Sequence, residues 1–312
     1  MIRVRNLTKY YNDFCAVNSI NLDINKGEIL GLLGPNGAGK TTTLRMLTGF
    51  FKPSAGDINV NDFSILTHSL EIKKLIGYLP ESAPLYHNML VFDYLDYIAT
   101  IRGLDKEKRI KRLKELSDMC GLAKIMHRPV NELSKGLKQR VGIAHAMMTD
   151  PEILILDEPT SGLDPNQIAD IRSIIKRIGK EKTIIFSTHI LSEAEATCDR
   201  IVIVNKGEIV ADDSTKALKK KARQGSCIRL SLSGADSEKA EELLKEISKD
   251  LNIEKTESKE SGVVSFEIKT LNNMDLRKEI YLKIKATDWI ITEFFMESKT
   301  LEKIFRELTK EN

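Results

Sequence analysis

Two short segments constrain the fold of this chain more than any other feature. Residues 34–41 read GPNGAGKT, which fits the pattern G-x-x-x-x-G-K-[ST], between an apolar run at 29–33 and a helix-compatible stretch at 41–47. A strand, a loop and a helix in that order form the context in which the pattern binds phosphate. Residues 153–158 read ILILDE, four apolar residues followed by two acids. Such a run is typical of a buried parallel strand whose carboxyl end faces a ligand, so the pair predicts an α/β nucleotide-binding fold.

The residues of the first segment have separate expected roles. Glycines let the main chain wrap closely round phosphate oxygens, and the following helix presents its positive end to the anion. Lys40 is expected to bridge the β- and γ-phosphates, and the Thr41 hydroxyl to contact Mg²⁺, which takes hard oxygen ligands. The residues that we expect to hold the nucleotide here are Asn36, Gly37, Ala38, Gly39, Lys40, Thr41 and Thr42.

The acids of the second segment predict the chemistry. Asp157 is the expected Mg²⁺ partner, and Glu158 is the carboxylate expected to orient and deprotonate an attacking water. The alternative is an ordinary strand end followed by a proline turn. That alternative explains Pro159 but not two adjacent acids after a hydrophobic run.

Composition limits the partners that the chain can have. The 312 residues carry a net charge of +3 from 48 basic and 45 acidic side chains, so charge balance gives nucleic-acid binding no support. No apolar stretch approaches the roughly 20 residues that span a bilayer, and the N-terminus lacks a secretory apolar segment. We therefore expect a cytoplasmic protein. The four cysteines have no C-x-x-C spacing, so neither zinc nor a disulfide framework is predicted.

Hydrophobic periodicity predicts two domains. Residues 1–222 form the nucleotide-binding domain, and helical spacing from about 85 to 150 predicts a helical subdomain between the two halves of its sheet. We place a boundary near Gly225. Residues 226–312 follow the order strand, helix, strand, strand, helix, strand and a last helix at 301–308, which suits a small ferredoxin-like α+β domain. It carries no nucleotide loop or acid pair, so a structural or regulatory role is expected.

The motifs, taken in order, resemble the ATP-binding subunits of ABC transporters, over residues 1–222. GPNGAGKT matches Walker A, ILILDE matches Walker B, LSKGLKQR at 133–140 corresponds to the signature, and SGLD at 161–164 looks like the D-loop. The resemblance implies that His189 contacts the γ-phosphate and that Tyr11 stacks on adenine, with Val17 in the same nucleotide site. It also implies that Ser134, Gly136 and Asp164 contact nucleotide across a dimer.

Two positions depart from the family pattern. Lys135 and Leu137 stand in the signature where the family usually has a glycine and a glutamine, although such a lysine is familiar among exporter ATPases. Glu81 stands where most members place the Q-loop glutamine that links Mg²⁺ to the membrane partner. A carboxylate can bind Mg²⁺ as an amide oxygen does, but it cannot donate a hydrogen bond.

The resemblance implies an ATPase that powers export through a separate membrane-spanning permease, at the inner face of the cell membrane. Two cassettes pair head to tail, and because one chain carries all the motifs, a homodimer is favoured. The 78–93 loop is expected to form part of the groove for the permease. One alternative is a soluble ABC ATPase acting on DNA or ribosomes, but those chains usually contain a long coiled coil or tandem cassettes. Another is a regulatory module without turnover, disfavoured by Glu158 and His189.

Overall fold

The chain divides into two compact units. The computed structural model describes residues 1–223, 227–247, 251–256, 262–270 and 275–297, and four single positions from 302 to 309. One unit is Met1–Thr215 and the other is Lys216–Lys310. This division falls at the start of helix α8 (Thr215–Arg223), after its first residue, whereas the sequence places its boundary after that segment, near Gly225.

The first unit holds ten strands and seven complete α-helices in its described residues. Its strands are β1 (Ile2–Tyr11), β2 (Phe14–Ile24), β3 (Ile29–Leu33), β4 (Ala55–Val60), β5 (Phe63–Ser64), β6 (Ile76–Leu79), β7 (Ile153–Leu156), β8 (Thr183–Thr188), β9 (Arg200–Asn205) and β10 (Glu208–Ser214). Its helices are α1 (Lys40–Leu47), α2 (Ser69–Leu75), α3 (Val91–Ile101), α4 (Lys106–Cys120), α5 (Lys135–Ala146), α6 (Pro165–Ile178) and α7 (Leu191–Thr197).

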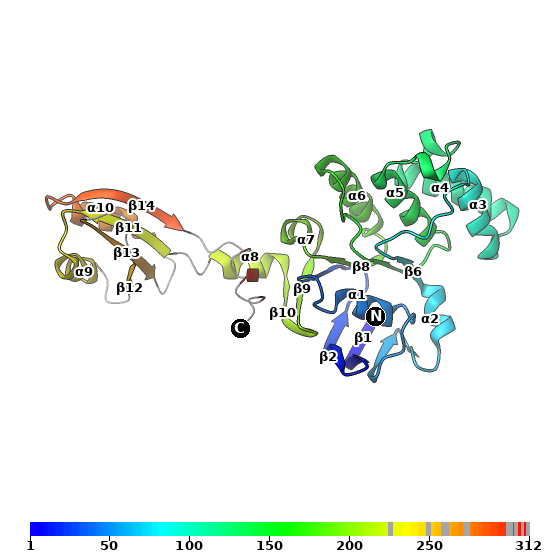
Figure 1. The fold of residues 1–312 in the computed structure, drawn as a ribbon, viewed down its shortest axis with the longest axis horizontal. Coiled ribbons are helices and arrows are strands. Elements are labelled where there is room, and N and C mark those ends of the chain that lie inside the picture. The colour runs from blue at the N-terminus through cyan, green and yellow to red at the C-terminus, as the bar shows by residue number, and fades with distance from the viewer. Residues whose placement is uncertain are drawn as a thin grey trace. The chain divides into compact units, whose positions relative to one another are not determined.

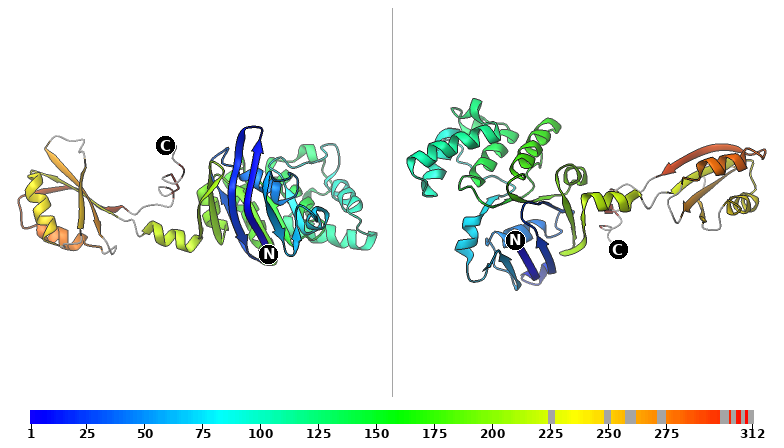
Figure 2. Two further views of the ribbon diagram at one scale, coloured as in Figure 1. Left: turned by 90° about the horizontal axis from the view of Figure 1, so that it is seen from below. Right: turned by 180° about the vertical axis from the view of Figure 1, so that it is seen from behind.

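A six-stranded sheet carries the two sequence motifs. Its order is β10-β9-β3-β8-β7-β6, parallel except where β10 runs antiparallel to β9. Every residue of β3, β7 and β8 is buried, which explains why these strands read as continuous apolar runs. The predicted α/β nucleotide-binding fold is confirmed. A second, antiparallel sheet of order β2-β1-β4-β5 was not predicted from the sequence, and Figure 2 shows its long strands β1 and β2 side by side.

Helix α1 lies in the core between these two sheets. Leu44, Met46 and Leu47 are fully buried and share one hydrophobic cluster with Val4 of β1 and Leu32 of β3. Burial of such side chains contributes about 1.5–3 kcal/mol each. The helix that starts at Lys40 is therefore fixed from both sides, and with it the loop before it.

The predicted helical subdomain contains α3, α4 and α5, which gather apart from the antiparallel sheet (Figure 1). Asp105 caps α4 by accepting a hydrogen bond from the Lys108 N–H, and Gly121 ends the helix in the left-handed conformation. Across the described part of the chain, no helix combines the length and the apolar character needed to cross a bilayer.

The second unit is built round an antiparallel sheet. Its strands are β11 (Cys227–Ser233), β12 (Leu251–Thr256), β13 (Val263–Thr270) and β14 (Ile290–Glu297), in the order β12-β13-β11-β14. Helices α9 (Ser237–Lys245) and α10 (Arg277–Ile284) contribute Leu244 and Ile280 to a core with Leu230 and Phe266. The order is compatible with the predicted ferredoxin-like unit. The predicted helix at 301–308 lies largely outside the described residues.

We predict that Gly77→Ala destabilises the first unit by about 2 kcal/mol, as overpacking of a rigid site does. A Cβ on Gly77 would lie 2.2 Å from the main-chain oxygen of Ala146, which only a backbone shift can relieve. The matched control is Gly179→Ala, where the nearest atom, at 2.5 Å, is the end of the Ile29 side chain and not backbone. Calorimetry should show a lower melting temperature for Gly77→Ala than for Gly179→Ala; equal values would contradict the packing described.

Candidate nucleotide-binding site

The 34–41 loop joins β3 to α1 and needs its glycines for close approach of backbone to backbone. A Cβ on Gly34 would lie 2.2 Å from the Val204 oxygen, and one on Gly39, which has φ +102°, would lie 2.5 Å from the Ala16 oxygen. The loop therefore packs against β9 and β2 in a way that other residues do not permit. Its N–H groups and the start of α1 make an anion site of the kind that the sequence predicts.

One cavity of about 420 Å³ collects most of the predicted site residues. The residues that line it are Tyr11, Phe14, Ala16, Asn36, Gly37, Ala38, Gly39, Lys40, Thr41, Thr42, Glu81, Glu158, Ser161 and His189. They come from both sheets, from α1 and from the segments that follow β6, β7 and β8. Glu81 is exposed at this cavity, where a carboxylate can reach an ion.

Lys40, Glu158 and His189 form one charged cluster. The Lys40 ammonium donates to the Gly34 oxygen at 2.8 Å and lies 3.4 Å from Glu158 Oε1. Glu158 Oε2 lies 2.9 Å from His189 Nδ1. Lys40 and Glu158 are nearly buried, whereas 43% of the His189 side chain is exposed. Glu158 also has a φ of +47°, an unusual conformation for a residue with a side chain, and such strain is frequent at functional sites.

Asp157 links three segments beside this cluster. Its Oδ1 accepts hydrogen bonds from the Thr41 hydroxyl at 3.0 Å and from the Ser187 hydroxyl at 2.7 Å. Its Oδ2 is buried and has no hydrogen-bond partner in the part of the chain that the structure describes. A buried carboxylate oxygen left unpaired costs free energy, and a hydroxyl beside a carboxylate is the donor set that Mg²⁺ prefers. Thr41 and Asp157 therefore fit the predicted metal.

Two aromatic side chains, Tyr11 and Phe14, also line the cavity. Tyr11 is 40% exposed, and its ring centroid lies 5.9 Å from that of Phe51 and 5.6 Å from the Lys9 ammonium. A flat ring held in this way offers a stacking surface for a base. Phe14, 65% exposed, pairs with Tyr11 at the hairpin end. Val17 is buried and does not line the cavity, although its neighbour Ala16 does.

Comparisons with known proteins identify the family. A family model described as ABC transporter matches residues 17–161. The bacitracin transport ATP-binding protein BcrA of Bacillus licheniformis is 39% identical over 226 residues, which are 72% of this chain and 73% of that protein. The lantibiotic transport ATP-binding protein SrtF of Streptococcus pyogenes is 38% identical over 213 residues, 68% of this chain and 90% of that protein.

The chain belongs to the ABC transporter ATP-binding proteins. A solved dimer of an ATP-binding cassette, MJ0796, in a post-hydrolysis state with ADP and Pi, superimposes with a TM-score of 0.63 at 26% identity and covers 69% of this chain and 99% of that one. The protein is thus an ATP-binding subunit and an ATPase, and the predicted family, fold and reaction are confirmed. The alternative of a DNA-acting ATPase is not favoured by these relatives.

Ser134, Gly136 and Asp164 of this ABC protein lie outside the cavity lining. Ser134 is exposed and caps α5, its hydroxyl accepting from the Leu137 N–H at 3.3 Å. Gly136 is buried, and a Cβ on it would lie 2.8 Å from the side chain of Gln167. Asp164 is exposed and caps α6 by accepting from the Gln167 N–H at 2.9 Å. Gly136 and Asp164 therefore both lie next to Gln167, and Ser134 precedes Gly136 by two residues.

The structure also shows what surrounds the lysine that departs from the family signature. A Cβ on Gly162 would lie 2.5 Å from the Lys135 Nζ, so the ammonium rests against the glycine backbone of the SGLD segment. Gly162 has φ +65°, a conformation that glycine adopts without strain. Lys135 of the signature therefore lies next to the D-loop of the same chain.

Sequence reasoning missed several residues of the site. Phe14 and Ala16 line the cavity but match no motif position, and Ser161, the first residue of SGLD, lines it although no role was predicted for it. Ser187 accepts a hydrogen bond from the Glu158 N–H at 2.9 Å and donates to Asp157, so it holds both acids. The only signal for it is a hydroxyl that follows the apolar residues of β8, at the sheet edge where the acids also lie.

We predict that Lys40→Ala weakens ATP binding by at least tenfold, about 1.4 kcal/mol, because the ammonium is the cation of the loop that meets the phosphates. Titration calorimetry with ATP measures the affinity directly. Lys182→Ala is the matched control, since Lys182 pairs with Asp150 and does not line the cavity. Equal affinities of Lys40→Ala and wild type would contradict the phosphate role.

Proposed function

We propose that two copies of this ATPase enclose ATP between the 34–41 loop of one chain and the signature segment of the other, and that the cycle drives export through a membrane-spanning permease. The observation that carries the proposal is the arrangement of Lys40, Glu158 and His189 round one cavity, with Ser134 and Gly136 outside its lining. The dimer solved for the related cassette supports the pairing.

The surface that each chain offers to the nucleotide of the other chain is the start of α5. This helix has twelve residues and begins directly after Ser134, so its positive end and the Ser134 hydroxyl face outward at an exposed position. A helix start of this kind binds an anion well. Because each chain has both surfaces, two identical copies complete two sites, which supports a homodimer.

The charges of the cluster suit hydrolysis. ATP phosphates attract the Lys40 ammonium away from Glu158, which leaves this carboxylate to take a proton from the attacking water. His189, held by Glu158, contacts the γ-phosphate in this cavity. When Mg²⁺ is bound by Thr41 and Asp157, with Glu81 at the cavity, it neutralises phosphate charge. The interface contacts that the γ-phosphate supplies are lost when it leaves, which couples the reaction to opening of the dimer.

We predict that Glu158→Gln lowers kcat by about 10²–10⁴-fold and leaves ATP affinity intact, because the amide cannot accept the proton. A phosphate-release assay gives kcat, and gel filtration in ATP reports whether the variant stays dimeric. Glu152→Gln, at an exposed position just before β7, is the control. Turnover by Glu158→Gln near the wild-type rate would refute the assignment of the base.

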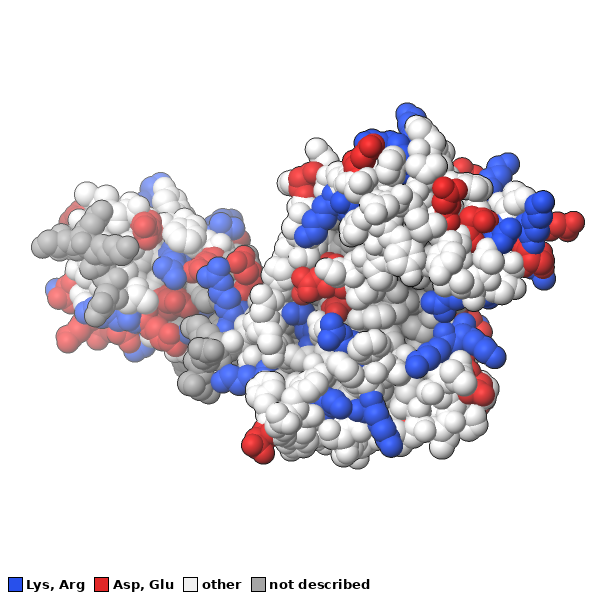
Figure 3. All heavy atoms as spheres, turned by 45° about the vertical axis from the view of Figure 1, so that its right-hand side comes forward, with Lys and Arg blue, Asp and Glu red and all other residues white. Residues whose placement is uncertain are grey.

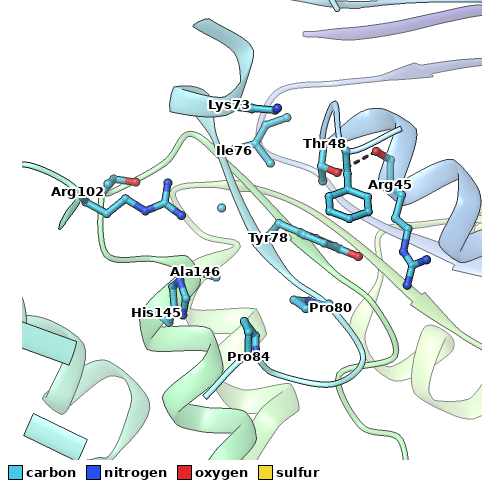
Figure 4. Close-up of a pocket in the computed structure, with 13 residues that line it drawn as sticks. Arg45, Thr48, Lys73, Ile76, Tyr78, Pro80, Pro84, Arg102, His145 and Ala146 are labelled. Carbon is cyan, nitrogen blue, oxygen red and sulfur yellow. Dashed lines mark hydrogen bonds between the residues drawn. The ribbon is translucent and has the colours of Figure 1, made fainter. Parts of the chain in front are cut away.

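A separate groove of about 630 Å³ suits the permease. Figure 4 shows Tyr78 on its floor, with Arg45 and Arg102 on either side and Lys73 above. The lining is mostly apolar, and among the described residues it contains no carboxylate. Its residues are Arg45, Thr48, Phe50, Lys73, Ile76, Gly77, Tyr78, Pro80, Pro84, Arg102, His145, Ala146 and Thr149. An amphipathic helix with acidic residues at its edges therefore fits this groove, in agreement with the predicted role of the 78–93 loop.

Buried neutral groups stiffen the wall of the groove. Burial, with a smaller contribution from Arg102, lowers the pKa of His145 to about 4, so the ring is neutral at pH 7. Its Nδ1 lies 2.5 Å from the Tyr94 oxygen, and the Tyr94 hydroxyl donates to the Pro84 oxygen at 3.0 Å. Since the hydroxyl has one proton, His145 is the donor in the first contact. This chain of bonds fixes the loop after β6 to the helical subdomain.

The relatives named above serve bacitracin and lantibiotic transport, which supports export as the direction and the inner face of the membrane as the location. The distribution of surface charge supports a protein partner. On the face drawn in Figure 3, basic and acidic side chains are interspersed instead of forming one basic field. We expect the permease, and not this subunit, to select the transported substrate.

We predict that the double variant Arg45→Glu/Arg102→Glu loses membrane attachment while its ATPase activity in the absence of the permease stays near wild type. The two reversed charges repel an acidic docking helix but do not line the nucleotide cavity. The readout is membrane retention of the tagged subunit coexpressed with its membrane-spanning permease. Lys106→Glu/Lys124→Glu, at exposed positions outside the groove, is the matched control. Retention of both variants would contradict the assignment of the groove.

A further inference from the structure

Glu193 is a buried carboxylate that no motif explains. It lies on α7 and is 7% exposed. Its Oε2 accepts hydrogen bonds from the Thr160 hydroxyl at 2.5 Å and from the Thr188 hydroxyl at 3.1 Å. Its Oε1 is buried and has no hydrogen-bond partner in the described residues. A buried carboxyl oxygen without a hydrogen-bond partner is costly, so stability alone does not account for this residue.

The two threonines belong to the two segments that carry the catalytic pair. Thr160 follows Glu158 by two residues, and Thr188 directly precedes His189. Thr188 Oγ1 also accepts from the Ile190 N–H at 3.0 Å, so it fixes the backbone on both sides of His189. One oxygen of Glu193 thus holds the segment after β7 to the segment after β8.

The contact that depends on this link is the one between Glu158 and His189. Their side chains meet at 2.9 Å, and Glu158 keeps its φ of +47° only where its surroundings impose it. Ser187 fixes the Glu158 N–H from one side. The Glu193 contacts fix Thr160, two residues further along, to Thr188 beside His189, so both segments are held in one geometry.

We propose that Glu193 is a positioning residue, which ties the Walker B segment to the switch histidine and sets the geometry of the water-activating carboxylate. This inference rests on the proposed roles of Glu158 and His189. It requires the hydrogen bonds of Thr160 and Thr188 to matter for kcat and not for ATP binding, because neither threonine lines the cavity.

The test compares threonine variants that differ only in the hydroxyl. Thr160→Val and Thr188→Val keep the shape and remove the donor, whereas Thr160→Ser and Thr188→Ser keep the donor and remove a methyl. We expect the valine variants to lower kcat by roughly 10- to 100-fold, with KM for ATP within about threefold, as small misplacements of catalytic groups do. The serine variants should retain most of the wild-type kcat. Glu193→Leu should resemble the valine variants.

The control for a purely structural effect is Thr215→Val. Thr215 is buried, and its hydroxyl donates to the Cys198 oxygen at 2.6 Å, away from the cavity. This variant should lower the melting temperature without lowering kcat. If the Thr160 and Thr188 valine variants behave like Thr215→Val, or if the serine variants lose as much kcat as the valines, the positioning role is refuted. Glu158→Gln is assayed in parallel, because normal turnover by that variant would refute the proposed function itself.

Discussion

The carboxylate of Asp157 is the constraint on which the site depends. It stands at the end of a strand buried on both faces, and its two hydroxyl partners come from the start of α1 and the end of β8. A charge can be kept in such a place only if fixed donors or a cation compensate it. Because α1 is itself held between two sheets, the fold positions the phosphate loop, the acids and the switch segment relative to one another.

The positive and negative side chains of the resulting cluster compensate one another. Lys40 is shared between loop carbonyl oxygens and Glu158, and Glu158 is shared between Lys40 and His189. The arrival of phosphates offers the ammonium a stronger partner and thereby changes the surroundings of the base. In the proposed dimer the same event brings Ser134 of the other chain to the nucleotide, so binding, pairing and activation of water depend on one another.

Sequence patterns predicted the parallel sheet and the phosphate loop because both impose local rules, namely apolar runs for doubly buried strands and glycines for close backbone contacts. They also identified Lys40, Thr41, Asp157, Glu158 and His189, which the structure brings together. The antiparallel sheet was missed, since β4 and β5 are short and only half buried. Ser187, Thr160 and Glu193 were missed because their partners lie 5 to 33 positions away and meet only through the fold. Val17 was also assigned to the nucleotide site; in the structure it is buried and does not line the cavity.

If each nucleotide site is shared between two chains, two variants that damage opposite surfaces should complement each other. Lys40→Ala removes the phosphate lysine from one surface, and Ser134→Arg blocks the other. Each variant alone should be inactive. Mixed in equal amounts, they should regain roughly a quarter of wild-type ATPase activity, because half of the dimers are hybrids with one intact site. No recovery on mixing, or full activity of Ser134→Arg alone, would contradict the shared site.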